Sequence, residues 1–373
     1  GDGELMADYS TIKGFTVQTL SSDPYATEVL GATWASGTDF PSTTVWGAGF
    51  GIQTAAVYGF GLDNPGAYVR TTFEYDGTSW AGPATVNRAT GAACAGLGTQ
   101  TAGLIAGGTT TPPNAVVTLT ETYDGSSWST SPGTLNTART NPKGTGTTTA
   151  GIIFGGTTGL GSGPTQPAMN NTETWNGSAW TETNDMNTAR NNPFSLGTTN
   201  PASTAVAAGG QTGATLITDA ETWDGTSWTE VNNINTGRFS MTGTGPTTAG
   251  LIAGGNINPP TDYVAWVETY NGTSWTETTD IPAGDAGMGS ASQGTTTAAF
   301  YFGGTLPGPG TGGLFWNGSA WTTSPAMATA RTNNLQQCGT QTSALAFGAD
   351  PSAATTEEYS DPAPIVTKTV TIS

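Results

Sequence analysis

Arginine and glutamate recur at fixed points of this 373-residue chain, and together they have the chemistry of an anion-binding or acid–base site. The arginines follow an Asn-Thr-Ala tripeptide or a relative of it: Arg139, Arg190, Arg238 and Arg331, with Arg88 in a looser copy. The glutamates stand just before an aromatic residue: Glu74, Glu121, Glu173, Glu221 and Glu268. A guanidinium can equally fork onto a carboxylate as a buried structural pair. Because a site is needed once and this pattern recurs, we expect structural pairs.

One copy of the pattern departs from both positions. Asp285 stands where the arginine is expected, and Leu314 stands where the glutamate is expected. Two partners would be lost together in this way. The sequence therefore predicts that the Arg and the Glu of each copy contact each other.

The absence of histidine excludes several classes of catalytic and metal site. These are Ser-His-Asp and Cys-His nucleophilic centres and the zinc, copper and iron sites with histidine ligands. The two cysteines, Cys94 and Cys338, form no CxxC motif and fall at similar points of different repeats, so we expect buried thiols and no disulfide. We expect no enzyme activity, no metal and no cofactor.

The composition favours a folded chain of short strands and tight turns. It contains 55 Gly, 12 Trp, 12 Phe and 10 Tyr, whereas charged residues make up only 10%, which is the reverse of a disordered chain. The net charge is −18 and no cluster of Lys and Arg exists, so we expect no nucleic-acid partner. No apolar run is long enough to predict membrane insertion, and the opening residues lack the pattern of a signal peptide.

The positions of these residues follow from a repeat with two strand-forming segments. The first segment contains Asp-Gly or Asn-Gly between β-favouring residues, which is a strong signal for a hairpin. Its copies are FEYDGTSW (73–80), ETYDGSSW (121–128), ETWNGSAW (173–180), ETWDGTSW (221–228), ETYNGTSW (268–275) and LFWNGSAW (314–321). The second segment is an apolar strand that ends in paired glycines, found at 104–108, 152–156, 205–210, 251–255 and 300–304, with degenerate copies at 57–61 and 345–349. Together with a first strand that follows the arginine, these segments make each unit four short strands.

Seven such units predict an all-β, seven-bladed β-propeller of four-stranded antiparallel blades, because closing the ring protects the strand edges. The last unit has an aromatic strand, TEEYS (356–360), but no Trp strand after it, while VLGATW (29–34) is an orphan. We therefore expect the N-terminal strand with Trp34 to close the last blade. The propeller spans 29–360, between an N-terminal arm (1–28) and a C-terminal arm (361–373), and the alternating apolar residues of both arms predict strands that pair with each other or with another subunit.

Paired glycines, an aromatic residue, a tryptophan and an arginine, in this order, resemble the kelch repeat over residues 29 to 360. More narrowly, MADYSTIKGFTVQTLSSDP (6–24) and units such as ETWDGTSWTEVNNINTGR (221–238) resemble kelch-like proteins encoded by tailed phages of marine bacteria. This second resemblance implies a non-enzymatic virion structural protein, such as a tail fibre, appendage or surface decoration, that mediates attachment or assembly. The alternative is a carbohydrate-binding kelch propeller that is secreted or held on a bacterial cell surface.

A kelch-type enzyme is the third alternative. The copper-radical oxidases of this group need histidine ligands, which are missing here. Sugar mutarotases need a unique acid–base pair, and none stands out. The recurring tryptophans have the chemistry of sugar-stacking platforms, but their regularity favours a core role: Trp80, Trp128, Trp180, Trp228, Trp275 and Trp321.

The connections after the paired glycines vary most, at 109–117, 157–171, 256–266 and 305–313. Rigid scaffolds carry function on variable loops, so we expect this face of the ring to contact a ligand or partner. The best single cluster combines polar and aromatic groups: Asn256, Asn258, Asp262, Tyr263 and Trp266. The alternative is that these loops drift or pack on neighbouring subunits. Expected partners are other virion proteins, self-association through the terminal arms, or a host surface glycan.

Overall fold

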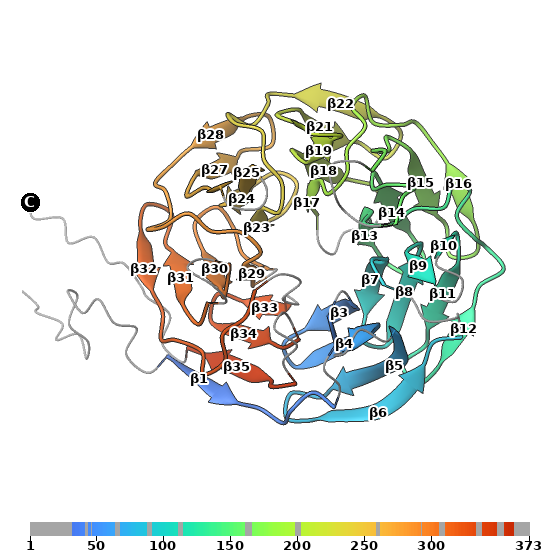
Figure 1. Ribbon diagram of the computed structural model, residues 1–373, viewed down its shortest axis with the longest axis horizontal. Helices are drawn as coiled ribbons and strands as arrows, with labels where there is room; N and C mark the ends of the chain where they lie inside the picture. The colour runs from blue at the N-terminus through green and yellow to red at the C-terminus, as the bar shows by residue number, and fades with distance from the viewer. Residues whose placement is uncertain are drawn as a thin grey trace, which may run out of the picture.

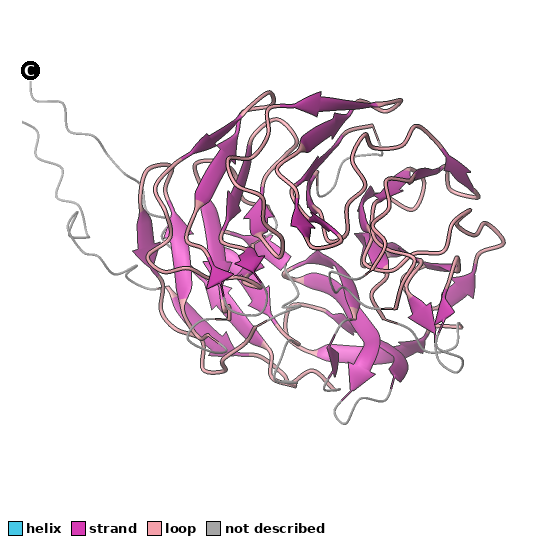
Figure 2. Ribbon diagram, turned by 45° about the horizontal axis from the view of Figure 1, so that its top comes forward, coloured by secondary structure: helices cyan, strands magenta, loops and turns pink. Residues whose placement is uncertain are grey.

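The computed structural model is a ring of seven antiparallel four-stranded sheets, so the prediction of an all-β, seven-bladed propeller is confirmed. Figure 1 looks along the axis of the ring, and Figure 2 shows strands and loops without a helix. The structure describes residues 32–41, 44–45, 47–63, 68–87, 92–110, 115–160, 166–197, 203–258, 262–291, 293–305, 310–332, 338–348 and 354–361. No helix among these residues is long and apolar enough to cross a membrane. The two arms predicted at the termini lie outside the described residues, apart from Asp361.

Each blade runs from an innermost strand beside the ring axis to an outermost strand at the circumference. Blades 1 to 3, from inside to outside, consist of β3 (Ala48–Ile52), β4 (Ala55–Asp63), β5 (Tyr68–Tyr75) and β6 (Trp80–Thr85); β7 (Ala95–Thr99), β8 (Ala102–Ala106), β11 (Thr120–Tyr123) and β12 (Trp128–Thr130); and β13 (Lys143–Gly146), β14 (Gly151–Phe154), β15 (Thr172–Trp175) and β16 (Trp180–Glu182). In blade 1, the short strand β2 (Thr44–Val45) also pairs with the end of β4.

Blades 4 to 7 repeat this order. They consist of β17 (Phe194–Leu196), β18 (Ala205–Ala208), β21 (Ala220–Trp223) and β22 (Trp228–Val231); β23 (Thr242–Thr244), β24 (Gly250–Ala253), β27 (Val267–Tyr270) and β28 (Trp275–Glu277); β29 (Gly289–Ser290), β30 (Ala299–Phe302), β31 (Gly313–Trp316) and β32 (Trp321–Thr323); and β33 (Cys338–Thr340), β34 (Ser343–Ala346), β35 (Glu357–Ser360) and β1 (Thr33–Ser36).

The Asp-Gly and Asn-Gly turns join the third strand of a blade to the fourth. In blade 2, Asp124 Oδ1 accepts the N–H groups of Ser126 (2.9 Å) and Ser127 (2.8 Å), and Gly125 has a φ of 92°. A side-chain carbonyl or carboxylate that accepts these donors fixes the turn, and glycine adopts the positive φ at no steric cost. Asn176 makes the same contacts in blade 3, with its Oδ1 accepting from Ser178 and Ala179.

The paired glycines couple each blade to the next. The N–H of Gly156, in blade 3, donates to the carbonyl of Arg190 at 3.1 Å, where the chain enters blade 4. A Cβ on Gly156 would lie 2.5 Å from the carbonyl oxygen of Thr140. Only glycine permits so close a backbone approach, which explains why this position recurs in the sequence.

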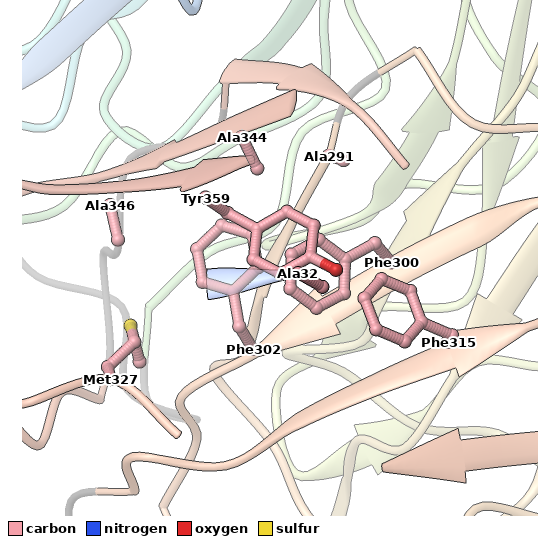
Figure 3. Packing of buried hydrophobic residues seen from close by; sticks show 9 residues of the cluster. All are labelled: Ala32, Ala291, Phe300, Phe302, Phe315, Met327, Ala344, Ala346 and Tyr359. Atoms are coloured by element: carbon pink, nitrogen blue, oxygen red, sulfur yellow. The ribbon is translucent and has the colours of Figure 1, made fainter. Parts of the chain in front are cut away.

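The N-terminal strand closes the ring, as the sequence predicts. β1 pairs with β35 in antiparallel register, so that Trp34 lies opposite Tyr359. The Trp34 ring also packs on Phe302 of blade 6, with centroids 5.2 Å apart. Figure 3 shows the cluster behind this contact, in which rings from blades 6 and 7 meet: Phe300, Phe302, Phe315 and Tyr359. Both ends of the propeller thus lie in one sheet.

Neighbouring blades interlock through large side chains that fill spaces left by glycine. A Cβ on Gly103 would lie 2.1 Å from the Phe50 ring of blade 1, and a Cβ on Gly250 would lie 2.1 Å from Leu196 of blade 4. Buried aromatic residues add further contacts, such as Phe154 against Trp228 with centroids 4.9 Å apart. The core is therefore a series of layers between the sheets.

Candidate functional site

Each recurring arginine pairs with the glutamate on the third strand of the blade that follows it. The four ion pairs among the described residues are Arg139–Glu173 (2.7 Å), Arg190–Glu221 (2.5 Å), Arg238–Glu268 (2.8 Å) and Arg331–Glu357 (3.3 Å). All eight residues are buried. Glu357 completes the series that the sequence only partly identified, and Arg88 lies outside the described residues.

The Arg139–Glu173 pair shows what these charges do. The Glu173 carboxylate also accepts the N–H of Asn136 at 2.7 Å, and Arg139 donates to the carbonyl of Asn171 at 2.8 Å. Burial lowers the pKa of the Arg139 guanidinium, and the charge of Glu173 opposes this shift. The pair joins the segments 136–139 and 171–173, and both of its side chains are fully buried, so it is structural.

Blade 6 lacks the pair because both of its members are replaced. Asp285 stands just before the first strand of blade 6, at the position that arginine occupies in other blades. Its Oδ1 accepts the N–H of Thr305 at 2.6 Å. Leu314 packs against the apolar cluster between blades 5 and 6. The joint loss that the sequence displays is therefore the loss of two contacting partners.

Glu74 does not belong to this series, and its assignment from the sequence is wrong by one position. Tyr75 lies opposite Ala56, as Tyr123 lies opposite Gly103 in blade 2, so Phe73 occupies the place of the paired glutamate. Glu74 points to the other face of the sheet and accepts the hydroxyl hydrogen of Tyr123 at 2.8 Å. Counting back from the aromatic residue of the turn motif identifies the correct position.

The tryptophans of the fourth strands hold adjacent blades together. The indole N–H of Trp128 donates to Thr72 Oγ1 of the preceding blade at 2.9 Å, and Trp228 donates to Thr172 in the same way at 2.8 Å. Trp80 and Trp180 likewise donate to threonines of their preceding blades. Trp275 has no acceptor among the described residues, because Ala220 occupies the threonine position. Trp321 donates instead to the Thr279 carbonyl.

The cluster predicted at 256–266 is a hairpin on the face of the ring reached after the second and fourth strands, which we call the loop face. β25 (Asn256–Asn258) pairs with β26 (Asp262–Tyr263), so that Asn256 lies opposite Tyr263 and the backbone of Asn258 lies opposite Asp262. Trp266 lies at the base of the hairpin, where its carbonyl accepts the Gly254 N–H at 3.0 Å. The structure therefore brings four of the five predicted residues into one hairpin.

These residues differ in how far they face solvent. Asp262 is exposed, and Tyr263 and Trp266 are half-buried. Asn256 is only 6% exposed, and its N–H donates to the carbonyl of Phe239 at 2.8 Å. Asn256 is thus part of the scaffold, and the surface available to a partner is centred on Asp262 and Tyr263.

Similar hairpins stand on the loop face of blades 2 to 5. β9 (Thr109–Thr110) pairs with β10 (Ala115–Val116), and β19 (Gln211–Thr212) pairs with β20 (Thr215–Leu216). In blade 3, an isolated bridge joins Thr157 to Ala168. The hairpin itself is therefore a repeated element, and only its side chains are particular to blade 5.

The remaining chemistry is sparse. No group of three or more acidic or cysteine side chains among the described residues is placed to hold a metal ion. Cys94 is half-buried against the core between blades 1 and 2, whereas full burial was expected. The Cys338 side chain lies outside the described residues. No protein-family model matches this chain, and no curated protein matches it.

Proposed function

We propose that this propeller is a non-enzymatic structural protein of a phage virion that mediates attachment or assembly through its loop face. The carrying observation is that the repeated reactive groups are used inside the ring: the arginines pair with glutamates, and most of the fourth-strand indoles bond to a neighbouring blade. Groups that repeat therefore stabilise the ring. Recognition is then assigned to groups that do not repeat, and the exposed Asp262 beside Tyr263 is the clearest example.

The virion assignment rests on the segment 6–24 and on units such as 221–238, which resemble kelch-like proteins of tailed phages. A rigid ring that presents hairpins from four consecutive blades suits a protein that must hold a partner without chemistry. Terminal arms that pair with neighbouring subunits would provide the assembly contacts.

Attachment is tested by adsorption of particles that carry a double variant, Asp262→Ala with Tyr263→Ala. These two side chains lie at the accessible part of the hairpin, so we expect adsorption to fall while the melting temperature stays unchanged. Replacing the whole of 256–266 is not a suitable test, because Asn256 and Val264 are buried. The matched control is Asp224→Asn in a turn on the opposite face, where asparagine occupies the same position in other blades. Full adsorption by the double variant would contradict the attachment role.

The second candidate is a carbohydrate-binding propeller that is secreted or held on a bacterial cell surface. It is favoured by the half-buried rings of Tyr263 and Trp266 near the exposed carboxylate of Asp262, since sugars stack on aromatic faces and donate hydroxyl hydrogens to carboxylates. Quantitative mass spectrometry separates the two candidates. Recovery of the protein in repeated copies on purified virions supports the first, and recovery from the cell envelope or medium of uninfected bacteria supports the second.

A further inference from the structure

A single lysine occupies a position where the other blades carry no charge. Lys143 begins β13, the innermost strand of blade 3, and pairs with Phe154 just before the paired glycines. This register puts Lys143 at the loop-face end of the strand, beside the ring axis. The corresponding residues of blades 2, 4, 5 and 6 are Ala95, Phe194, Thr242 and Gly289. The fold therefore does not need a cation at this position.

Lys143 has no partner in the part of the chain that the structure describes. Lys143 is an exposed residue, and it forms no ion pair or hydrogen bond there. The described arginines differ, because four pair with glutamates and Arg70 donates to the Val86 carbonyl at 2.6 Å. Although the chain has 27 acidic residues, none that the structure describes compensates the charge of Lys143.

The protein around Lys143 desolvates its ammonium group but supplies no described negative charge beside it. The surrounding protein partly desolvates the side chain and lowers the pKa of its ammonium group, and no carboxylate among the described residues opposes that shift. Arg139 differs, since Glu173 opposes the desolvation of its guanidinium. A partly desolvated cation without a counter-charge is unfavourable, and an anion from outside would relieve it.

A second unused donor lies behind Lys143 on the same strand. Residues two apart on a strand share a face of the sheet, so Thr145 lies on the same face of β13 as Lys143. Thr145 is only 4% exposed, and its hydroxyl has no hydrogen-bond partner among the described residues. Its counterpart in blade 5, Thr244, donates to the carbonyl of Ala291 at 3.1 Å. Blade 3 thus keeps two donors unused on one face.

Many of the exposed acidic residues lie away from this point, although Asp185 and Asp262 lie on the loop face. The exposed carboxylates of Asp76, Asp124 and Asp224 lie in the turns of the opposite face. Those of Glu182, Glu230 and Glu277 lie on the outermost strands. The described innermost strands contain no Asp or Glu. An anion that approaches along the ring axis from the loop face therefore avoids the negative charge that covers the circumference.

We propose that Lys143 binds an oxyanion, a carboxylate or phosphate group of the ligand, at the loop-face end of the ring axis, with the Thr145 hydroxyl as a second donor. An ammonium group offers three donors, and its hydrogen bonds to an oxyanion are charge-assisted. The site lies on the face assigned above to partner contact, but small-anion binding does not depend on that assignment. It adds a positively charged group to a face whose described exposed charges include Asp185 and Asp262.

The test is calorimetric titration of the whole chain with three probes: inorganic phosphate, glucuronate and glucose. We expect phosphate or glucuronate to bind and glucose not to bind, and the stronger of the two anions identifies whether the ligand group is phosphate or carboxylate. Lys143→Met should weaken anion binding about tenfold or more, whereas Lys143→Arg, which keeps the charge, should retain it. Unchanged melting temperatures of both variants show that the ring is intact.

Two results would overturn the proposal. One is the absence of any binding of either anion to the unaltered chain, and the other is equal binding by Lys143→Met. Thr145→Val tests the second donor, since equal affinity would remove Thr145 from the site. Adsorption lost in the Asp262 and Tyr263 double variant with anion binding retained would show that the two proposals concern separate groups.

Discussion

Removing Arg190 should destabilise the ring far more than removing both members of its ion pair. Arg190→Met leaves the Glu221 carboxylate buried with only two of its donors, the N–H groups of Asn187 (2.6 Å) and Thr188 (3.2 Å). Breaking one side of a buried pair costs about 3–5 kcal/mol. This free-energy loss includes the two hydrogen bonds that Arg190 donates to the carbonyls of Gly209 and Asp219.

The double variant Arg190→Met with Glu221→Leu removes the stranded charge as well. It still leaves the carbonyls of Gly209 and Asp219 without their donor, so we expect a loss of about 1–3 kcal/mol. Blade 6 shows that a blade forms without this pair, since it carries Asp285 and Leu314.

Urea unfolding followed by tryptophan fluorescence measures these free energies, with Thr181→Ser on an exposed outer strand as the control that should change nothing. If Arg190→Met unfolds at the same urea concentration as the unaltered chain, the buried pair is not a stabilising contact. If the double variant is less stable than the single one, the stranded carboxylate is not the source of the loss.

Three further predictions follow from contacts between and within blades. Ala220→Thr supplies Trp275 with the hydroxyl acceptor that Thr172 gives Trp228, and thermal unfolding should show a gain of about 0.5–1.5 kcal/mol; a loss would mean that the site cannot hold the larger side chain. Turn hydrogen bonds lower the pKa of Asp124 and of Asp224 to about 2, so their contribution is complete above the ordinary carboxyl pKa and is lost as pH falls toward 2. Melting temperatures measured across that range should therefore fall less in the double variant Asp124→Asn with Asp224→Asn, and identical pH profiles would refute the assignment. Removal of residues 1–36 deletes β1 and exposes Tyr359 and Phe302, so circular dichroism melts should show a less stable ring, and undiminished stability would argue against closure by this strand.

The architecture was predictable because irregular copies of the repeat show which strands and which residues must lie side by side. The missing Trp strand after TEEYS and the orphan Trp34 together specify the β1–β35 pairing, and the joint change at Asp285 and Leu314 specifies which residues touch. Glu74 was misplaced because it directly precedes Tyr75, whereas the paired glutamates precede their aromatic residue by two positions, so strand alternation puts Glu74 on the other face.

The candidate site was less predictable, for a different physical reason. Hairpins such as β25–β26 are two or three residues long per strand and have no apolar alternation, so only the fold reveals them. The burial of Asn256 depends on its backbone pairing with Phe239, which is distant in the repeat. Lys143 was overlooked because a single residue has no pattern, although it is the only lysine between the two arms.

The register of the closing strand has a mechanical consequence. Thr33 lies opposite Ser360, so the chain enters and leaves the β1–β35 ladder at the same end. A force that pulls the two termini apart would open this ladder pair by pair, like a zipper, instead of loading its hydrogen bonds together. A tether attached to only one terminus would not pull β1 and β35 apart. A ring that works under tension is therefore better held by one arm, with the load passing through its face.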